Sequence, residues 1–321
     1  MKLAGMSVFV LLLCGTLCMG AEQPPVEFAR EPGKVLVRIG GEPVATYVYA
    51  DEKITRPYFC DVYGPGGVRL TRNHPPQEGD LGDHATMHPG IWLAFGDISG
   101  NDYWRLKART VHDGFVEEPT GRGGFGTFVV RNRYLTEAGD GTVCTEVCRL
   151  RFIVPPYGYM LFWDSTFSSD EGDFYFGDQE EMGLGVRLPT PIAEKVGKGG
   201  LVTDSEGREG ARAVWGKQAD WCDYSGEMGG KQLGITIMPH ARNFGPCWWH
   251  SRDYGFMAAN PFGRNAFTKG PKSRIVVRKG ESLRLSYGVL LHAGPARERP
   301  DLAAAYGFYV RASADWRPGR R

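Results

Sequence analysis

After its first twenty residues the sequence has no long apolar run and no excess of charge of either sign. Of 38 basic and 37 acidic residues, the first twenty positions hold only the base Lys2, which leaves 37 of each. A nucleic-acid partner requires a basic face, and a transmembrane helix requires about 20 consecutive apolar residues. We therefore expect no nucleic-acid partner and no transmembrane span after residue 20.

Signatures of the common cofactor enzymes are also missing. The sequence has no HExxH, no GxSxG elbow, no P-loop and no CxxC pair. Its one GxGxxG match, Gly121 to Gly126, reads as a hairpin turn because no helix pattern follows it. Nicotinamide, nucleoside triphosphate and zinc-protease chemistry therefore have no support, and we expect no cofactor.

Cysteines are few, and their number is odd once residues 1–20 are set aside. Cys144 and Cys148 would share one face of a strand about 13 Å apart, too far for a disulfide. One disulfide elsewhere is plausible in an exported protein. The five cysteines after residue 20 are Cys60, Cys144, Cys148, Cys222 and Cys247.

The beginning of the chain has the pattern of a secretory signal peptide. Lys2 precedes an apolar run from Val8 to Leu13, and small residues lead to Gly20, where we expect cleavage. We therefore expect a periplasmic or extracellular protein. Lipid anchoring through Cys14 or Cys18 is less favoured, because small residues do not fill the positions just before either cysteine.

Nearly every patterned segment alternates with period two, which is typical of strands. The many turns, with 45 Gly and 21 Pro, and the lack of helices between strands argue against a parallel sheet. We expect an all-β fold, a large antiparallel β-sandwich, as a single domain over residues 34–321 after a linker over 21–33. The expected strands are 34–39 with 44–49, 125–135 with 142–154, 159–167, 233–238, and 274–278 with 282–291, and the one expected helix is 301–312.

Four segments carry a resemblance to a known family: RPYFCDVYGPGG from Arg56, DHATMHPGIWLAFGDISGNDYW from Asp83, WGKQADWCDYSG from Trp215 and WWHSRDYGFMAANPFG from Trp248. In this order they resemble exported bacterial proteins often labelled "methane oxygenase PmoA" and otherwise of unknown function. Many members read DHPHHRGLWFAHGD in the second segment. His84 and His88 match that pattern, whereas Met87 and Phe95 stand where further histidines are common.

The oxygenase label conflicts with the composition. A membrane methane monooxygenase subunit needs several apolar spans, and this chain has none after residue 20. We therefore reject that activity. The β-rich pattern of the family is similar to the galactose mutarotase-like sandwiches, many of which bind or process sugars, so the resemblance implies that fold and a sugar ligand.

The first candidate site segment contains Asp83, His84, His88 and Trp92 around a Gly/Pro-broken turn. Histidines in a loop suit general acid-base work and hydrogen bonding to sugar hydroxyls. The structural alternative is that Asp83 caps a turn and one histidine bonds backbone. A shared metal would need the turn at Pro89-Gly90, because two positions four apart in a strand are separated by about 13 Å.

The second candidate segment follows Trp248. Adjacent tryptophans in a strand point to opposite faces, and we expect Trp248 in the core and Trp249 at a cleft, where an indole can stack on a sugar. His250 and Arg252 share a face, and the planar arginine can hold a carboxylate or a hydroxyl pair. Asn260, further along the loop, is an additional binding candidate.

Acids cluster from Asp178 to Glu181, and we expect Glu180 or Glu181 to be a base in the site, with Arg187 on the side of Glu181. The alternative is that such acids face water. Arg56 is a further binding candidate, or else a strand-edge arginine on Tyr58.

The sequence thus predicts an exported carbohydrate-active protein that performs hydrolysis, elimination or epimerisation. Its alternatives are a non-catalytic glycan-binding or envelope-associated module and a mononuclear metal enzyme using Asp83, His84 and His88. The predicted catalytic residues are His84, His88, His250 and Glu180, and the predicted binding residues are Arg56, Asp83, Trp92, Glu181, Arg187, Trp249, Arg252 and Asn260.

Overall fold

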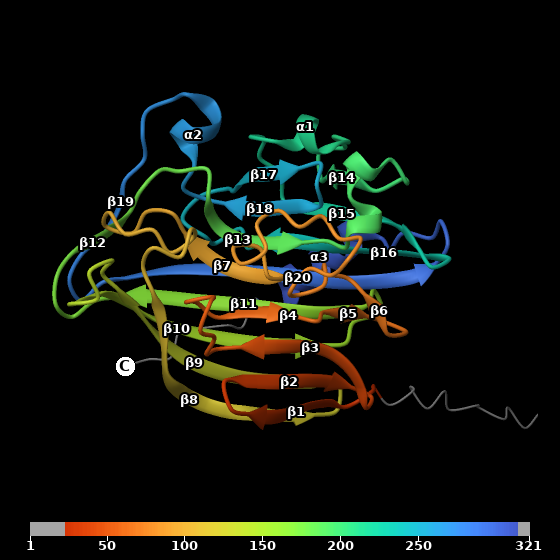
Figure 1. Cartoon of the computed structure of the whole chain (residues 1–321), viewed down its shortest axis with the longest axis horizontal. Helices are drawn as coiled ribbons and strands as arrows, with labels where there is room; N and C mark the ends of the chain where they lie inside the picture. The colour runs from red at the N-terminus through yellow and green to blue at the C-terminus, as the bar shows by residue number, and fades with distance from the viewer. Residues whose placement is uncertain (1–22, 314–321) are drawn as a thin grey trace, which may run out of the picture.

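The period-two segments form two eight-stranded antiparallel sheets that pack face to face in a computed structural model, which describes residues 23–313 (Figure 1). The first sheet has the order β1 (Val26–Glu31), β2 (Lys34–Ile39), β3 (Glu42–Val48), β4 (Tyr58–Cys60), β7 (Ile91–Phe95), β13 (Met182–Arg187), β18 (Phe256–Asn260) and β17 (Trp248–Arg252). The second has β14 (Leu201–Asp204), β15 (Cys222–Met228), β16 (Lys231–Pro239), β20 (Ser282–Pro295), β11 (Tyr159–Ser168), β10 (Thr142–Ile153), β9 (Phe125–Leu135) and β8 (Thr110–Arg122).

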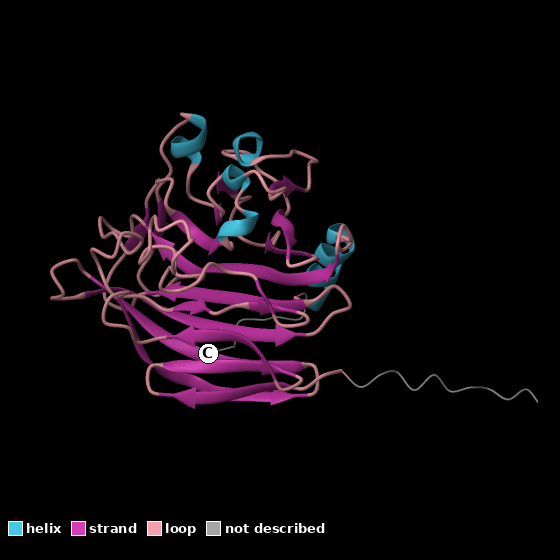
Figure 2. Cartoon of the chain, turned by 45° about the vertical axis from the view of Figure 1, so that its right-hand side comes forward, coloured by secondary structure: helices cyan, strands magenta, loops and turns pink. Residues whose placement is uncertain are grey.

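Smaller elements complete the molecule. Two short ribbons pair β5 (Tyr63–Gly64) with β6 (Val68–Arg69) and β12 (Phe174–Phe176) with β19 (Ile275–Val277). The helices are α1 (Ala211–Val214), α2 (Arg264–Thr268) and α3 (Leu302–Ala312), with 3-10 turns η1 (Thr190–Ile192) and η2 (Glu194–Val196). Figure 2 shows how few helices accompany the strands. Within residues 23–313 no helix has the length and apolarity to cross a bilayer.

The main core lies between the sheets and follows from strand alternation. In β7, Ile91, Leu93 and Phe95 join this core, whereas Trp92 and Ala94 point to the opposite face. At one edge the sheets meet where β1 runs beside β8, and the Val26 amide donates to Gly123 O at 2.8 Å (Figure 1).

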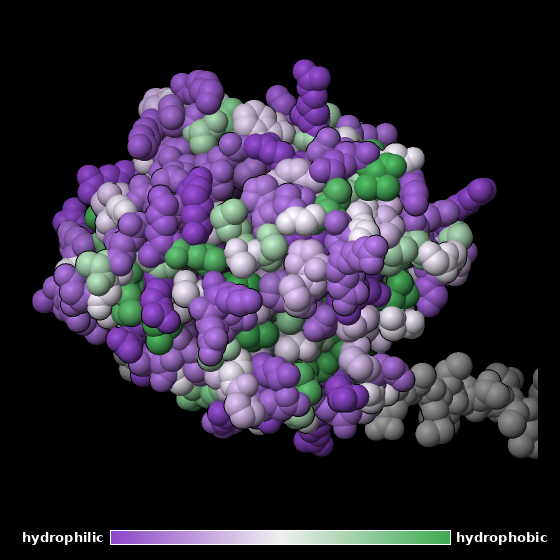
Figure 3. All heavy atoms as spheres, in the orientation of Figure 1, coloured by the Kyte–Doolittle hydropathy of each residue, from purple (hydrophilic) through white to green (hydrophobic). Residues whose placement is uncertain are grey.

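Each sheet also carries apolar residues on its outer face. Asp301 caps α3 by accepting a hydrogen bond from the Ala304 amide at 2.9 Å, and this helix packs Tyr309 against the second sheet. On the first sheet, Trp92, Trp104 and Phe256 belong to a separate cluster. On the face drawn in Figure 3, apolar groups are small and separated by polar ones. The surface loops over the first sheet lie on this outer cluster.

Most elements agree with the sequence analysis, including the all-β class, the first two hairpins and the C-terminal helix. The expected hairpin of 274–278 with 282–291 is wrong: β19 pairs with β12, and β20 pairs with β11 and β16. Alternation tells which side chains share a face but not which strand is the neighbour.

The segment expected to be a linker, residues 21–33, contains β1, which pairs with β2 along its whole length. Its charged residues resemble a solvated tail, but they belong to an edge strand on which Arg30 pairs with Glu118 at 2.7 Å. The cysteines after residue 20 are all free, so the disulfide is wrong among the described residues. The expected signal peptide, residues 1–20, lies outside the described residues.

Candidate functional site

A cavity of about 310 Å³ opens on the outer face of the first sheet, above the cluster of Trp92, Trp104 and Phe256. It brings together both histidine segments, which are more than 150 residues apart in the chain. Its lining consists of His84, Met87, His88, Trp104, Arg105, Glu181, His250, Arg252 and Tyr254.

The first histidine segment is a compact turn rather than an extended strand. The His88 amide donates to His84 O at 2.9 Å, and the two imidazole rings stack with centroids 4.6 Å apart. His84 has a left-handed backbone, with φ of 50°, which is uncommon for a residue other than glycine. The turn thus puts both rings at one cavity.

Asp83 fixes the outer imidazole. Both Asp83 oxygens accept hydrogen bonds from Arg187 at 2.8 Å, and Oδ2 lies 2.9 Å from His84 Nδ1. Because an ionised carboxylate only accepts, Nδ1 must carry the proton, which leaves Nε2 to exchange one. Partial burial raises the pKa of Asp83, but the bonds from Arg187 and His84 outweigh it and hold that pKa well below its ordinary value. Asp83 therefore stays ionised and orients His84.

The inner imidazole is enclosed. His88 packs between Trp92, at a centroid distance of 4.8 Å, and Phe256, at 4.6 Å. Burial, followed by the charges of His84 and three arginines, lowers the pKa of His88 far below its ordinary value. His88 is therefore neutral near pH 7.

Two buried arginines hold this loop by its backbone. Arg56 is 3% exposed and donates to the carbonyls of Met87, Tyr103 and Trp104. The prediction that Arg56 binds the ligand is therefore corrected, because its guanidinium binds backbone carbonyls of the cavity wall. Arg72, which sequence reasoning missed, donates to the carbonyls of Leu81, Asp83, His84 and His88.

The second histidine segment, on β17, surrounds Glu180. Glu180 Oε1 accepts from Trp215 Nε1 at 2.8 Å and from Arg252, and lies 3.2 Å from His250 Nε2. His250 Nδ1 lies 3.1 Å from the Glu180 carbonyl, which can only accept, so Nδ1 carries a proton. Trp215 was not predicted as a site residue, although its segment was part of the family resemblance.

The charges of this pair follow from its surroundings. Burial is the largest influence on His250 and lowers its pKa to about 3, against the opposing effect of the Glu180 carboxylate. Burial raises the pKa of Glu180, but His250, Trp215 and Arg252 together lower it below its ordinary value. Near pH 7 we therefore take Glu180 as ionised and His250 as neutral.

The neighbouring acid is oriented by a different arginine. Arg105 pairs with Glu181 at 2.5 Å and with Asp102 at 3.0 Å, and both Arg105 and Glu181 line the cavity. Asn260 is fully buried and donates to the carbonyls of Gln179 and Glu180. Its predicted binding role is therefore corrected to one of positioning the acidic segment.

Asp83 and Glu180 contact His84 and His250 but are not part of the cavity lining, and three other predicted binding residues are completely buried. Trp249 is completely buried in the core between the sheets, because strand alternation gives the outer face to His250 instead. Trp92 is completely buried beneath His88, and Arg187 is completely buried behind Asp83. Aromatic surface at the cavity comes from Trp104 and Tyr254.

Two glycines on β13 leave room for the groups that pack beneath the cavity. A Cβ atom added at Gly185 would lie 2.7 Å from the Trp92 ring and 3.3 Å from Trp104. At Gly183, whose φ is +96°, it would lie 2.0 Å from Ala259 O. The Gly183-Leu-Gly-Val-Arg187 spacing is the sequence signal for these packed rings, and it was missed.

The predicted ligand set for a mononuclear metal is not brought together as a cage. No group of three or more His, Cys, Asp or Glu side chains in residues 23–313 is arranged to hold a metal ion. His84 and His88 are stacked at 15°, so their nitrogens lie in parallel planes rather than converging on one point.

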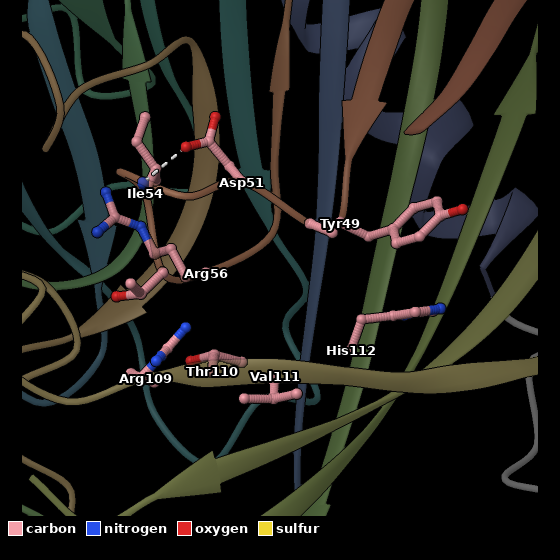
Figure 4. A pocket seen from close by; sticks show the side chains of 10 residues that line it. Tyr49, Asp51, Ile54, Arg56, Arg109, Thr110, Val111 and His112 are labelled. Carbon is pink, nitrogen blue, oxygen red and sulfur yellow. Dashed lines mark hydrogen bonds between the residues drawn. The ribbon is translucent and has the colours of Figure 1, made fainter. Parts of the chain in front are cut away.

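A second cavity, of about 360 Å³, lies between the end of β3 and the start of β8 (Figure 4). Tyr49 and His112 lie side by side there, and Asp51 turns toward the Ile54 amide. Asp51 accepts from the amides of Lys53 and Ile54 and from the Tyr58 hydroxyl. Since its carboxylate is already satisfied, this cavity offers less for chemistry than the one at His84 and His250.

Comparison with known proteins places the chain in a family. Residues 34–306 match the model of a family of unknown function, DUF6807. The chain belongs to this family. The methane oxygenase label is not confirmed. None of the curated proteins matches the chain.

Solved structures with related folds are distant. A galactose mutarotase-like protein from Lactobacillus casei is 12% identical, with a TM-score of 0.34, over 83% of this chain and 100% of its own. One from Clostridium acetobutylicum is 10% identical, with a TM-score of 0.34, over 85% and 99%. For a glycoside hydrolase family 97 enzyme from Pseudoalteromonas the values are 7%, 0.35, 85% and 35%, so the chain spans about a third of that enzyme.

Proposed function

We propose that this protein binds a sugar in the cavity between His84 and His250 and performs acid-base chemistry on it. The observation that carries the proposal is the meeting of three imidazoles, the Glu181 carboxylate and two arginines at one cavity, with the Glu180 carboxylate in contact with His250 and Arg252 of its lining. Sugar hydroxyls need many donors and acceptors in a small volume, and Trp104 and Tyr254 add aromatic surface.

His84 is the proposed base. Its Nδ1 proton is held by Asp83, so Nε2 can take a proton from a sugar hydroxyl or carbon, as an imidazole does best near neutral pH. Arg187 and Asp83 are positioning residues in this proposal, because they act through His84.

Glu180 and His250 have the second proposed role. Trp215 and Arg252 donate to the Glu180 carboxylate and His250 donates from Nδ1 to the Glu180 carbonyl, and the negative charge of Glu180 suits stabilisation of positive charge that develops at a sugar carbon. Hydrolysis develops positive charge at a sugar carbon, which the Glu180 carboxylate suits, whereas elimination and epimerisation by removal of a proton from carbon develop negative charge, which Arg105 and Arg252 suit. All three reactions need the proton exchange proposed for His84.

A non-catalytic glycan-binding function is the second candidate. It is favoured by the low pKa of His88 and His250, because neutral imidazoles in a buried site bind hydroxyls without supplying a proton. The two candidates differ in the pH dependence of ligand affinity between about pH 5 and 8, where an active histidine titrates and a purely binding site stays flat.

The test of the catalytic proposal uses His84→Ala and His250→Ala on a substrate that the protein turns over. His84→Ala should lose about 100-fold or more in kcat/KM, in the range of a lost general base, and His250→Ala should lose activity because it removes the side chain that positions Glu180. Losses within a factor of two in both variants would overturn the assigned roles. Circular dichroism of each variant controls for folding.

We also propose that the protein is exported, from the signal-peptide pattern of residues 1–20. Mass spectrometry of the protein from its native host should give a mature N-terminus near residue 21. An intact N-terminus would contradict export by this route.

A further inference from the structure

A separate cavity of about 330 Å³ adjoins the one described above, on the other side of Arg252. Arg252 is the one residue that the linings of these two cavities share. The adjoining cavity is lined by Ala211, Arg212, Trp215, Ser251, Arg252 and Asp253.

The Glu180 carboxylate contacts lining residues of both cavities. Its Oε1 accepts from Trp215, which lines the adjoining cavity, and from Arg252, which lines both. No hydrogen bond among residues 23–313 uses Oε2. This oxygen is therefore available to accept a hydroxyl from a ligand that passes from one cavity to the other.

The indole of Trp215 is held as a fixed wall. Its Nε1 is bound to Glu180, and its ring packs edge-on against Phe267 at a centroid distance of 5.3 Å. The Arg252 guanidinium lies 5.7 Å from the ring centroid. An aromatic wall that is already ordered binds a sugar face at little cost in conformational entropy.

One cation in the lining of the adjoining cavity has no ion-pair partner within residues 23–313. Arg212 is exposed on α1 and makes no ion pair within residues 23–313, whereas Arg252 is paired with Glu180. Asp253 is the only acid in the lining. A planar guanidinium next to a fixed indole is well matched to a sugar ring that carries a carboxylate.

We infer that the adjoining cavity is a second subsite, and that the ligand is an acidic oligosaccharide whose neighbouring units lie on either side of Arg252. This inference depends on the proposed function of the first cavity. A carboxylate on the second unit would pair with Arg212, its ring would face Trp215, and a hydroxyl near the linkage would donate to Glu180 Oε2.

The experiment is calorimetric titration with sugars of increasing length. The probes are galacturonate, its α-1,4-linked dimer and trimer, the corresponding mannuronate series and hyaluronan fragments, with neutral galactose oligomers for comparison. Affinity should rise at least tenfold from monomer to dimer in one acidic series and remain low in the neutral series. Arg212→Ala should remove about tenfold of the dimer affinity, the value of one charge-assisted hydrogen bond, and leave monomer affinity unchanged.

Arg131→Ala is the matched control, because Arg131 is exposed on β9 of the other sheet. Trp215→Phe keeps an aromatic wall and should retain more dimer affinity than Trp215→Ala. Equal affinity for monomer and dimer would overturn the second subsite, and equal affinity for acidic and neutral dimers would overturn the acidic ligand. Either result leaves the first cavity as proposed. If no sugar of any length binds, the proposed function fails together with this inference.

Discussion

Asp83→Asn should destabilise the protein as a whole, beyond any effect on a ligand. Arg187 is completely buried, and its two terminal nitrogens donate to the two Asp83 oxygens at 2.8 Å. The asparagine removes the negative charge and one acceptor, so the buried guanidinium loses its compensating partner. The stability of the first sheet therefore depends on a residue in the histidine loop.

The size of the effect follows from burial. Removal of one partner from a fully buried ion pair costs about 3–5 kcal/mol. The Asp83 side chain is 31% exposed, and solvent there reduces the cost, so we expect about 2–3 kcal/mol. For a protein of this size that is a fall of about 3–5 °C in Tm.

Differential scanning calorimetry at pH 7 measures this fall. Asp113→Asn is the control, because Asp113 also pairs with an arginine, Arg133, at 3.0 Å, but that arginine is 43% exposed where Arg187 is buried, so the variant should lose less than about 0.5 kcal/mol. The folded pKa of Asp83 is depressed, so its stabilisation is full above the unfolded value of about 4 and declines as pH falls below it. Equal Tm values for Asp83→Asn and the control at pH 7 would refute the reasoning.

Two further perturbations test the packing at Gly185 and the protonation of the buried Glu146. Gly185→Ala should lower the free energy of unfolding by about 1–3 kcal/mol in chemical denaturation, because its Cβ would meet the Trp92 ring at 2.7 Å. Gly172→Ala, with open space around its Cβ, is the control and should be nearly neutral. Similar losses in the two variants would contradict the packing argument. Burial raises the pKa of Glu146 in the core, so its contribution to stability is greatest below about pH 4 and is lost as pH rises through the folded value. The Tm of Glu146→Gln relative to wild type should therefore increase from pH 4 to pH 8. A constant difference would mean that burial does not raise the pKa of Glu146.

The sequence was informative about strands because alternation is a local property. Strands 34–39 and 125–135 are β2 and β9 with the predicted bounds, and Asp301 caps the predicted helix. The pairing of β19 with β12 depends on contacts between segments 100 residues apart. No local pattern encodes such a contact, so that prediction failed.

For the candidate site, sequence reasoning identified the histidines but not what surrounds them. His84, His88, His250 and Arg252 all line one cavity. Their shared loop settings and strand faces were visible in the sequence. Arg72 and Trp215 were missed. In a sequence, an arginine that will be buried and bind backbone carbonyls cannot be distinguished from a surface arginine.

Mass spectrometry of products tests the central claim most directly. The mature protein would be incubated with acidic and neutral oligosaccharides, with a His84→Ala, His250→Ala double variant in parallel. We predict a new product from the wild type alone: cleavage with gain of water for a hydrolase, cleavage without it for a lyase, or an isomer of unchanged mass separated by chromatography. Binding of a sugar with no product in any of these three channels would contradict catalysis and favour a glycan-binding protein.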